Sequence, residues 1–309
     1  MHKDASTTLA WQRLRALASA PQSAIAGLFA AEPDRSARCM VEGAGLTLDF
    51  SRQRASAAVL QALTQLAGEI DLRERIACMY RGDVANPTEN RQVLHTALRR
   101  NGAPHAAEVA AERERMLAFA EGVRSGQLRS SCGEPFELVV NIGIGGSDLG
   151  PAMAVEALRQ FTSGAPRIAF VSNIDGNRLA DTLATANPRR TLFIVCSKTF
   201  TTLETRTNAD TARRWLAAAL GNAAVPAHFA AVSVNAPAMD TFGIHPDYRF
   251  AMWDWTGGRY SIWSSIGVAL AVAIGAQCFR YFLAGGAAMD EHFLAAPWGQ
   301  NLPALMGLL

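Results

Sequence analysis

The residue best suited to chemistry is Arg259, which follows a glycine pair in a short aromatic segment. Residues 252–264 read MWDWTGGRYSIWS and hold three tryptophans and two adjacent glycines beside this arginine. Adjacent glycines let the backbone turn sharply and let a ligand approach closely. An arginine stays charged in proteins, and its planar fork suits phosphate, carboxylate and enediolate oxygens. The segment predicts an anion site. Alternatively, Arg259 pairs with Asp254 and only braces the loop.

A second segment gathers hydroxyl groups. Residues 197–205 read SKTFTTLET and carry five hydroxyls and one ammonium group where an apolar run gives way to a helical pattern. Hydroxyls and backbone amides can hold a phosphate monoester without a heavy positive charge. We therefore predict phosphate binding by this segment. In the alternative, Thr201 or Thr202 caps a helix and Lys198 is solvated.

A third segment is rich in glycine. Residues 141–151 read NIGIGGSDLGP, so several backbone N–H groups and the Ser147 hydroxyl precede a helical pattern whose start favours negative charge. The glycine spacing fits neither the dinucleotide fingerprint nor the P-loop. The alternative is a tight turn in which Ser147 or Asp148 caps the helix. Taken together, the three segments predict a pocket for a small sugar phosphate with a guanidinium beside it.

Short apolar runs alternate with helical patterns through the second half of the chain. This alternation predicts β-α-β units and a mainly parallel sheet buried on both faces, an α/β fold of three layers. Strands are expected at 136–140, 167–171, 191–195, 229–234 and 248–253, and helices at 149–161, 178–183 and 203–220. Ligands of such sheets bind at the carboxyl ends of the strands, so the three segments are expected at one edge.

The first 130 residues are mainly helical in pattern. Helical patterns occur at 57–66, 91–99 and 106–123, with a short strand expected at 46–50. The polar, turn-rich stretch 125–135 marks a boundary. We predict a helical N-terminal region at 1–130 and an α/β domain at 131–280, followed by a separate final segment at 281–309.

Composition excludes several classes of protein. The chain has 309 residues, of which 50% are hydrophobic and 18% charged, and its formal net charge is only +2. These values argue against disorder and nucleic-acid binding. Five scattered cysteines and no metal-ligand spacing fit a reducing compartment, so we expect a cytoplasmic protein. Residues 262–279 are apolar enough for a membrane span, but we interpret them as a buried helix.

The three segments also resemble one known family. Residues 141–151, 197–205 and 253–261 are similar to motifs of the glucose-6-phosphate isomerase family, as are residues 86–95 (NPTENRQVLH) and 289–309. This resemblance runs from about residue 46 to the last residue. It implies two sugar-isomerase domains, each an α/β sandwich, preceded by a helical region.

The resemblance also implies an activity and its residues. The matches to Ser147, Ser197, Thr199 and Thr202 hold the phosphate of a hexose 6-phosphate, and the matches to Gly146 and Lys198 line the same site. The match to Arg259 stabilises a cis-enediolate between glucose 6-phosphate and fructose 6-phosphate. The family needs no metal or organic cofactor and acts as a homodimer in glycolysis and gluconeogenesis.

Some of the family's catalytic residues have no match in this sequence. The family's base glutamate, ring-opening histidine and ring-opening lysine match nothing before residue 309, and Glu204, Asp254 and Glu291 do not match the base. We therefore expect the chain to be the N-terminal part of the enzyme, with 281–309 leading to a second sugar-isomerase domain. Activity of these 309 residues alone is then doubtful. A non-catalytic module that binds sugar phosphates is the competing hypothesis.

Overall fold

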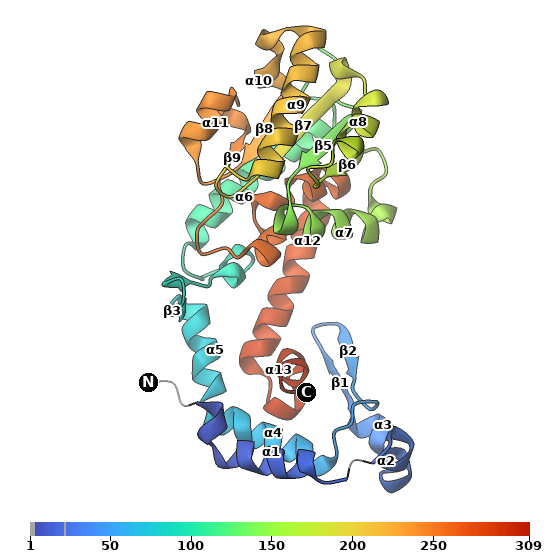
Figure 1. The fold of residues 1–309 in the computed structure, drawn as a ribbon, viewed down its shortest axis with the longest axis vertical. Helices are drawn as coiled ribbons and strands as arrows, with labels where there is room; N and C mark the ends of the chain where they lie inside the picture. The colour runs from blue at the N-terminus through green and yellow to red at the C-terminus, as the bar shows by residue number, and fades with distance from the viewer. Residues whose placement is uncertain (1–3, 22) are drawn as a thin grey trace. The chain divides into compact units, whose positions relative to one another are not determined.

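The computed structural model describes residues 4–21 and 23–309 (Figure 1). Its contacts divide the chain into two compact units, one formed by the described residues up to Ala85 with Ala284–Leu309, the other by Asn86–Leu283. This division differs from the predicted boundaries near residues 130 and 280. The reason is that α6 (Ala106–Arg124) packs its apolar face into the core around the sheet. The domain boundaries stay a prediction.

The second unit is built on a five-stranded parallel sheet. Its strands are paired in the order β6-β5-β7-β8-β9. Leu138 at the start of β5 lies opposite Arg167 on β6 and opposite Thr191 on β7. The strands are β5 (Leu138–Ile142), β6 (Arg167–Val171), β7 (Thr191–Cys196), β8 (Phe229–Val232) and β9 (Arg249–Phe250). The predicted strands and the parallel sheet are confirmed. The expected strand at 248–253 is reduced to two residues.

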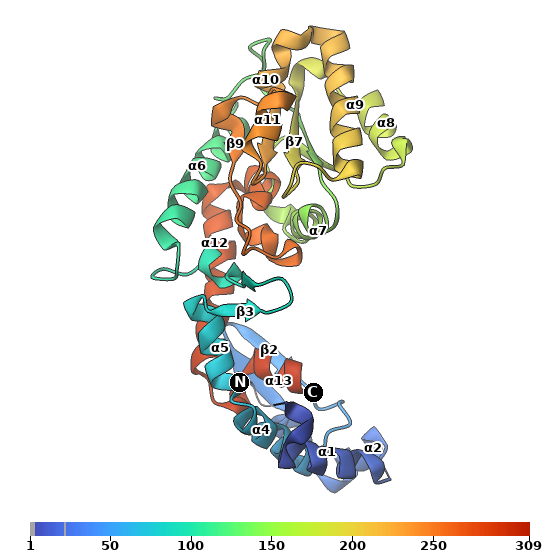
Figure 2. The ribbon, with the colours of Figure 1, turned by 60° about the vertical axis from the view of Figure 1, so that its left-hand side comes forward.

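Helices cover both faces of this sheet, which gives the expected three layers. Side chains alternate along each strand. Val139, Leu192 and Ile194 face a core shared with α6, α7 (Leu149–Ala157) and α12 (Val268–Ala295). Val140, Phe193 and Val195 face a core shared with α8 (Gly176–Ala184), α9 (Leu203–Leu220) and α11 (Ala236–Phe242). Figure 2 shows α6 and α12 on one side of the strands and α8 and α9 on the other.

Four helices of the second unit, α6, α7, α8 and α9, begin close to where the patterns predict them, whereas α10 (Val225–His228) and α11 have no counterpart among the predicted helices. The buried helix expected at 262–279 is α12, which begins at Val268 and continues past the end of the second unit to Ala295. The helix expected at 91–99 is wrong. This stretch forms a short strand, β4 (Arg91–Gln92), and a 3-10 turn (His95–Leu98), and Leu94 donates a backbone hydrogen bond to Trp255.

The long helix α12 is interrupted at Gly275. This residue has φ 81° and ψ 159°, a conformation open to glycine but costly for other residues. Glu121 accepts a hydrogen bond from the amide of Ala276 at 2.6 Å, and Arg124 donates to the carbonyl of Val272 at 3.2 Å. The two side chains of α6 thus satisfy backbone groups freed by the break.

One described helical stretch, Ser265–Ala295, is long and apolar enough to cross a membrane by length and composition alone. Its most apolar window is 72% buried inside the structure. Residues Val268, Leu270 and Val272 belong to the core beside the sheet. The stretch therefore has the features of a core helix of a soluble protein, as the sequence predicts for 262–279.

The first unit is smaller and mainly helical. Its elements are α1 (Leu9–Ser19), α2 (Ile25–Ala31), α3 (Arg35–Arg38), β1 (Met40–Gly43), β2 (Leu46–Asp49), α4 (Ala57–Glu69), α5 (Leu72–Arg81) and α13 (Leu302–Leu308). The short strand β3 (Val84–Asn86) contains the boundary between the two units, which falls after Ala85. The strand expected at 46–50 is confirmed as β2, which pairs antiparallel with β1. Cys39, Phe50 and Leu302 share its core.

Candidate functional site

The three predicted segments follow strands of the parallel sheet at their carboxyl ends. The glycine segment follows β5 and forms a 3-10 turn (Gly145–Ser147) before α7. The hydroxyl segment follows β7 and precedes α9, and the aromatic segment follows β9. Since all five strands are parallel, these segments emerge at the same edge.

The glycine and aromatic segments meet backbone to backbone. A Cβ built on Gly146 would lie 2.0 Å from the carbonyl oxygen of Gly258, a distance that no side chain allows. The Ser261 hydroxyl contacts the carbonyls of both residues, at 3.3 Å from Gly146 and 2.7 Å from Gly258. The absence of a side chain at Gly146 thus lets the turn that carries Ser147 pack against the turn that carries Arg259.

The glycine and hydroxyl segments are linked through buried Asn141. Its amide Nδ2 donates to the carbonyl of Ser147 at 3.0 Å, and its Oδ1 accepts from the thiol of Cys196 at 3.3 Å. Burial raises the pKa of Cys196 to about 12, so the thiol keeps the proton that it donates. A Cβ on Gly143 would lie 3.0 Å from the Cys196 carbonyl, which shows how closely the two strand ends approach.

The hydroxyl segment folds back on itself. The Ser197 and Thr202 hydroxyl oxygens are 3.3 Å apart, and the Thr201 hydroxyl donates to that of Thr199 at 2.8 Å. Thr202 is the N-cap residue of α9, but its side chain makes no capping hydrogen bond. The structure therefore does not support the alternative in which Thr202 serves as a side-chain cap.

Lys198 joins the hydroxyl segment to the aromatic one. Its ammonium donates to the carbonyl of Asp254 at 2.7 Å and lies 3.4 Å from the Asp254 carboxylate. The brace that sequence reasoning gave to Arg259 as an alternative is thus made by Lys198. Arg259 itself is exposed and makes no hydrogen bond or ion pair with any residue in the part of the chain that the structure describes.

Beside Arg259, two aromatic rings hold the turn in place. Tyr260 stacks on His95, with ring centroids 4.5 Å apart and planes 21° from parallel. Burial, with a smaller contribution from the positive charge of Arg99, lowers the pKa of His95 to about 4. The imidazole is therefore neutral at physiological pH, and it adds no charge next to the free guanidinium.

An open pocket lies where the aromatic segment faces residues 86–93. Lys198 is the one predicted site residue among those that line it. The full lining is Asn86, Glu89, Arg91, Gln92, Val93, Lys198, Asp254, Trp255, Thr256, Gly257, Gly258 and Tyr260. Contacts thus join the three segments in pairs, and one pocket opens beside their junction. The roles of Gly146, Ser147, Ser197, Thr199, Thr202 and Arg259 stay predictions.

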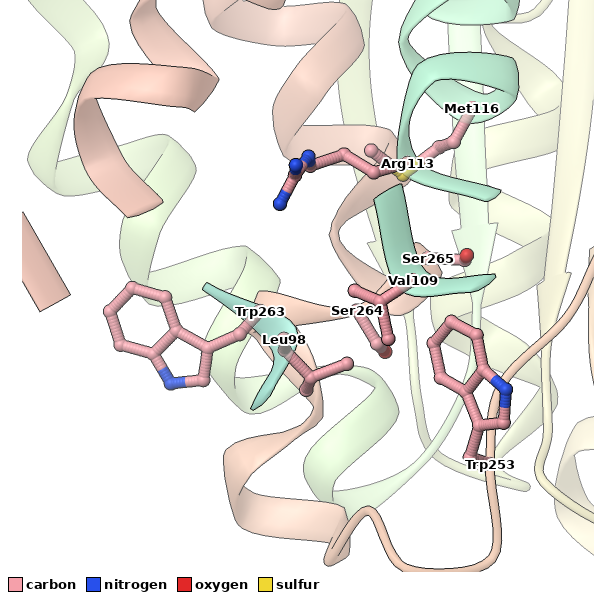
Figure 3. Close-up of a pocket in the computed structure, with 8 residues that line it drawn as sticks. All are labelled: Leu98, Val109, Arg113, Met116, Trp253, Trp263, Ser264 and Ser265. Carbon is pink, nitrogen blue, oxygen red and sulfur yellow. The ribbon is translucent and has the colours of Figure 1, made fainter. Parts of the chain in front are cut away.

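A second cavity, of about 10 Å³, lies behind the aromatic segment (Figure 3). Its lining includes Trp253 and Trp263, with Ser264, Ser265 and Arg113 as its polar residues. A space of this size holds about one water molecule. None of the predicted site residues lines this cavity. We therefore interpret it as a small packing defect beside the aromatic segment and not as a substrate pocket.

Sequence reasoning missed the buried polar groups beneath the segments. Asn141 interrupts an otherwise apolar strand, which is the signal that could have found it. Asp148 is also buried, and burial raises the pKa of its carboxyl. Among residues 4–21 and 23–309, no group of three or more His, Cys, Asp or Glu side chains could hold a metal ion.

Comparison with known proteins finds similar sequences over most of the chain. The family model described as phosphoglucose isomerase matches residues 49–309. A glucose-6-phosphate isomerase of Roseiflexus sp. (strain RS-1) is 51% identical over 291 residues, covering 91% of this chain and 54% of that protein. One from Anaeromyxobacter sp. (strain K) is 49% identical over 312 residues, covering 98% and 57%.

A solved structure is similar as well. The crystal structure of a glucose-6-phosphate isomerase from Chlamydia trachomatis D/UW-3/Cx matches with a TM-score of 0.87 at 30% identity, covering 99% of this chain and 60% of that one. The chain spans about half the length of the curated relatives that it matches.

Proposed function

Because the chain belongs to the phosphoglucose isomerase family, we propose that it binds hexose 6-phosphates for the interconversion of glucose 6-phosphate and fructose 6-phosphate. The observation that carries this proposal is the pairwise contact of the three segments. Gly146 lies against Gly258, and Lys198 reaches Asp254. These contacts fix the hydroxyl-bearing turns next to the turn that carries Arg259.

In this proposal the substrate phosphate binds to the hydroxyl and glycine segments. Ser197 and Thr202 present two hydroxyls 3.3 Å apart, and Ser147 and Thr199 add two more. The start of α9 contributes the partial positive charge of a helix N-terminus. Gly146 and Lys198 connect these two segments to the aromatic segment. The Lys198 ammonium, which is bound to Asp254, also lies near the proposed phosphate position.

Arg259 acts on the reacting end of the sugar. Its guanidinium is exposed and spends no hydrogen bond on the described protein, so its full fork remains available to a ligand. In the reaction a carboxylate moves a proton between C2 and C1, and negative charge develops on the enediolate oxygens. A preorganised guanidinium stabilises that charge without reorganising.

We assign the general base to none of the carboxylates near the three segments. Asp254 already neutralises Lys198 at 3.4 Å. Asp148 is buried beneath the glycine segment rather than exposed to a ligand. Glu204 lies in the first turn of α9 and, like Glu291, does not match the family's base.

We also propose the finer features that the family implies. These are a cytoplasmic homodimer that acts in glycolysis and gluconeogenesis without a metal or organic cofactor. The predicted domains, 1–130, 131–280 and 281–309, belong to the same proposal. The free guanidinium and the absence of a nucleotide fingerprint in residues 141–151 support a small phosphorylated sugar as the ligand.

The test combines turnover and binding for the 309-residue chain. A coupled assay follows conversion of fructose 6-phosphate to glucose 6-phosphate, and calorimetry measures the affinity for fructose 6-phosphate, with fructose as the control ligand. Turnover would place a proton-transferring group within these residues. Binding without turnover would favour the module hypothesis for this chain, and equal affinity for fructose and its phosphate would overturn the proposal.

A further inference from the structure

We propose that Phe200 is a positioning residue, which sets the hydroxyl segment in the shape that receives a phosphate. This inference rests on the proposed function and adds a residue that touches no substrate. Phe200 has φ 59°, in the left-handed region that a residue with a large side chain rarely adopts. Such strain persists only where the surroundings hold the residue in place.

The buried side chain of Phe200 keeps its backbone in this conformation. It is 3% exposed and belongs to the apolar core between the sheet, α9 and α11. Its ring meets the ring of Phe242 edge to face, with centroids 5.8 Å apart. Burial of the aromatic ring offsets the free-energy cost of the left-handed backbone. The core thus forces the backbone to turn at this residue.

The turn at Phe200 organises the hydroxyl groups around it. Its amide donates to the Ser197 hydroxyl at 3.1 Å, and this places Ser197 within 3.3 Å of Thr202 on the far side of the turn. Without the left-handed residue, the chain between Ser197 and Thr202 could not fold back over so few residues. The two hydroxyls would then separate.

The back of the same turn is tied to the segment that follows β8. The Lys198 carbonyl accepts from the Ser233 hydroxyl at 2.9 Å, and the Thr199 carbonyl accepts from the Asn235 amide at 2.9 Å. In a trans peptide the next N–H points opposite to the carbonyl. The Thr199 amide therefore points away from this segment, and it has no acceptor within the described chain.

Phe200 therefore fixes which backbone and hydroxyl groups face outward. The buried ring thus keeps the Ser197 and Thr202 hydroxyls 3.3 Å apart, in a loop whose Thr199 amide has no acceptor within the described chain. In well-ordered sites, misplacing a group by about 1 Å can lower the reaction rate by roughly two orders of magnitude. A merely structural aromatic residue would affect folding but not the affinity for phosphate.

The test compares Phe200→Ala with Leu216→Ala. Leu216 is fully buried in the same apolar core, near the other end of α9, so its truncation damages the core without touching the loop. We expect Phe200→Ala to weaken fructose 6-phosphate and inorganic phosphate about tenfold or more. Leu216→Ala should keep both affinities within about twofold while it lowers stability to urea by a similar amount.

A conservative variant keeps the test decisive if Phe200→Ala does not fold. Phe200→Leu retains most of the apolar anchor, and we expect its affinity to stay within about threefold of the unmutated chain. Unchanged affinity in Phe200→Ala, or equal losses in Phe200→Ala and Leu216→Ala, would overturn the inference alone. If the unmutated chain bound neither ligand, the proposed function and this inference would both fail.

Discussion

The two edges of the parallel sheet differ in how their polar groups are used. At the amino edge, Glu134 pairs with both Arg189 and Arg190, each at 2.5 Å, and Arg190 also pairs with Glu137. At the carboxyl edge, Arg259 has no partner within the described chain, and the Ser197 and Thr202 hydroxyls face each other. At the amino edge two arginines are neutralised by carboxylates, whereas at the carboxyl edge the pair Lys198–Asp254 leaves the Arg259 guanidinium available to a ligand.

Backbone strain follows the same division. The carboxyl edge holds Phe200 at φ 59°, and its glycine and aromatic turns fit together only because Gly146 lacks a side chain. Strained, poorly satisfied regions of a fold cluster where function requires them. The comparison teaches that substitutions at the amino edge should affect stability alone, whereas those at the carboxyl edge should affect ligand binding first.

The largest effect is expected from Gly146→Ala. The added methyl would lie 2.0 Å from the Gly258 carbonyl, so the glycine and aromatic segments must separate. We expect affinity for fructose 6-phosphate to fall by about a hundredfold, measured by calorimetry. Gly176→Ala is the control, because nothing lies within 4 Å of its added methyl. Full affinity in Gly146→Ala would show that the two turns need not touch.

Acid should destabilise the protein partly through His95. Burial lowers its pKa from 6.5 to about 4, so the unfolded chain binds the proton first as pH falls. Stability from this residue is complete above pH 6.5, is lost as pH falls toward 4, and amounts to at most about 3 kcal/mol. Urea unfolding at several pH values should show a shallower loss in His95→Phe. An identical slope would contradict this role.

His228 at the amino edge sharpens this contrast. Burial also lowers the pKa of His228, but a hydrogen bond to the Thr191 carbonyl at 2.8 Å partly opposes the shift. Its other nitrogen contacts the Ser131 hydroxyl at 2.9 Å. The Nδ1 of His95 has no hydrogen-bond partner among the described residues. Of the two histidines, His95 should therefore contribute more to the acid sensitivity.

Arg259→Lys tests the free guanidinium directly. The charge remains, but the planar fork is lost, so in a preparation with isomerase activity we expect turnover to fall about tenfold or more, or roughly 1.4 kcal/mol in barrier. The Michaelis constant should change less. Arg189→Lys at the amino edge is the matched control, and its turnover should be unchanged. An unaltered rate in Arg259→Lys would remove this residue from the mechanism.

The smallest effect is expected from Glu134→Gln. This change removes the charge that pairs with Arg189 and Arg190, two partly exposed ion pairs. We expect only a small loss in unfolding free energy, because exposed ion pairs contribute little, and no change in affinity for fructose 6-phosphate. A large loss of affinity would show that the two edges of the sheet are coupled.

The sequence predicted the sheet well because its central strands β5, β7 and β8 are buried along their whole length. Residues 192–195 are apolar throughout, and the pattern of 203–220 coincides with α9. The position of the three segments at one edge follows from parallel topology alone. Local patterns were less useful at 91–99, where a contact with Trp255 replaces the expected helix, and at Gly275, where two side chains of α6 stabilise the break.

The site itself was only partly predictable. Glycine and hydroxyl content identified the turns, but long-range contacts decided their partners. Lys198 pairs with Asp254, 56 residues away, and no local pattern could have chosen it over Arg259. The roles of Asn141 and Phe200 depend on burial and backbone angle, which appear only in the folded chain.

The most direct test of the account is to map fructose 6-phosphate binding by NMR on the isotope-labelled chain, with fructose as the control ligand. We predict that the amide signals of Gly145–Ser147 and Ser197–Thr202 shift together at one affinity, and that the side-chain signal of Arg259 shifts with them. Shifts confined to the amino edge around Glu134 and Arg190, or equal shifts with fructose, would contradict it.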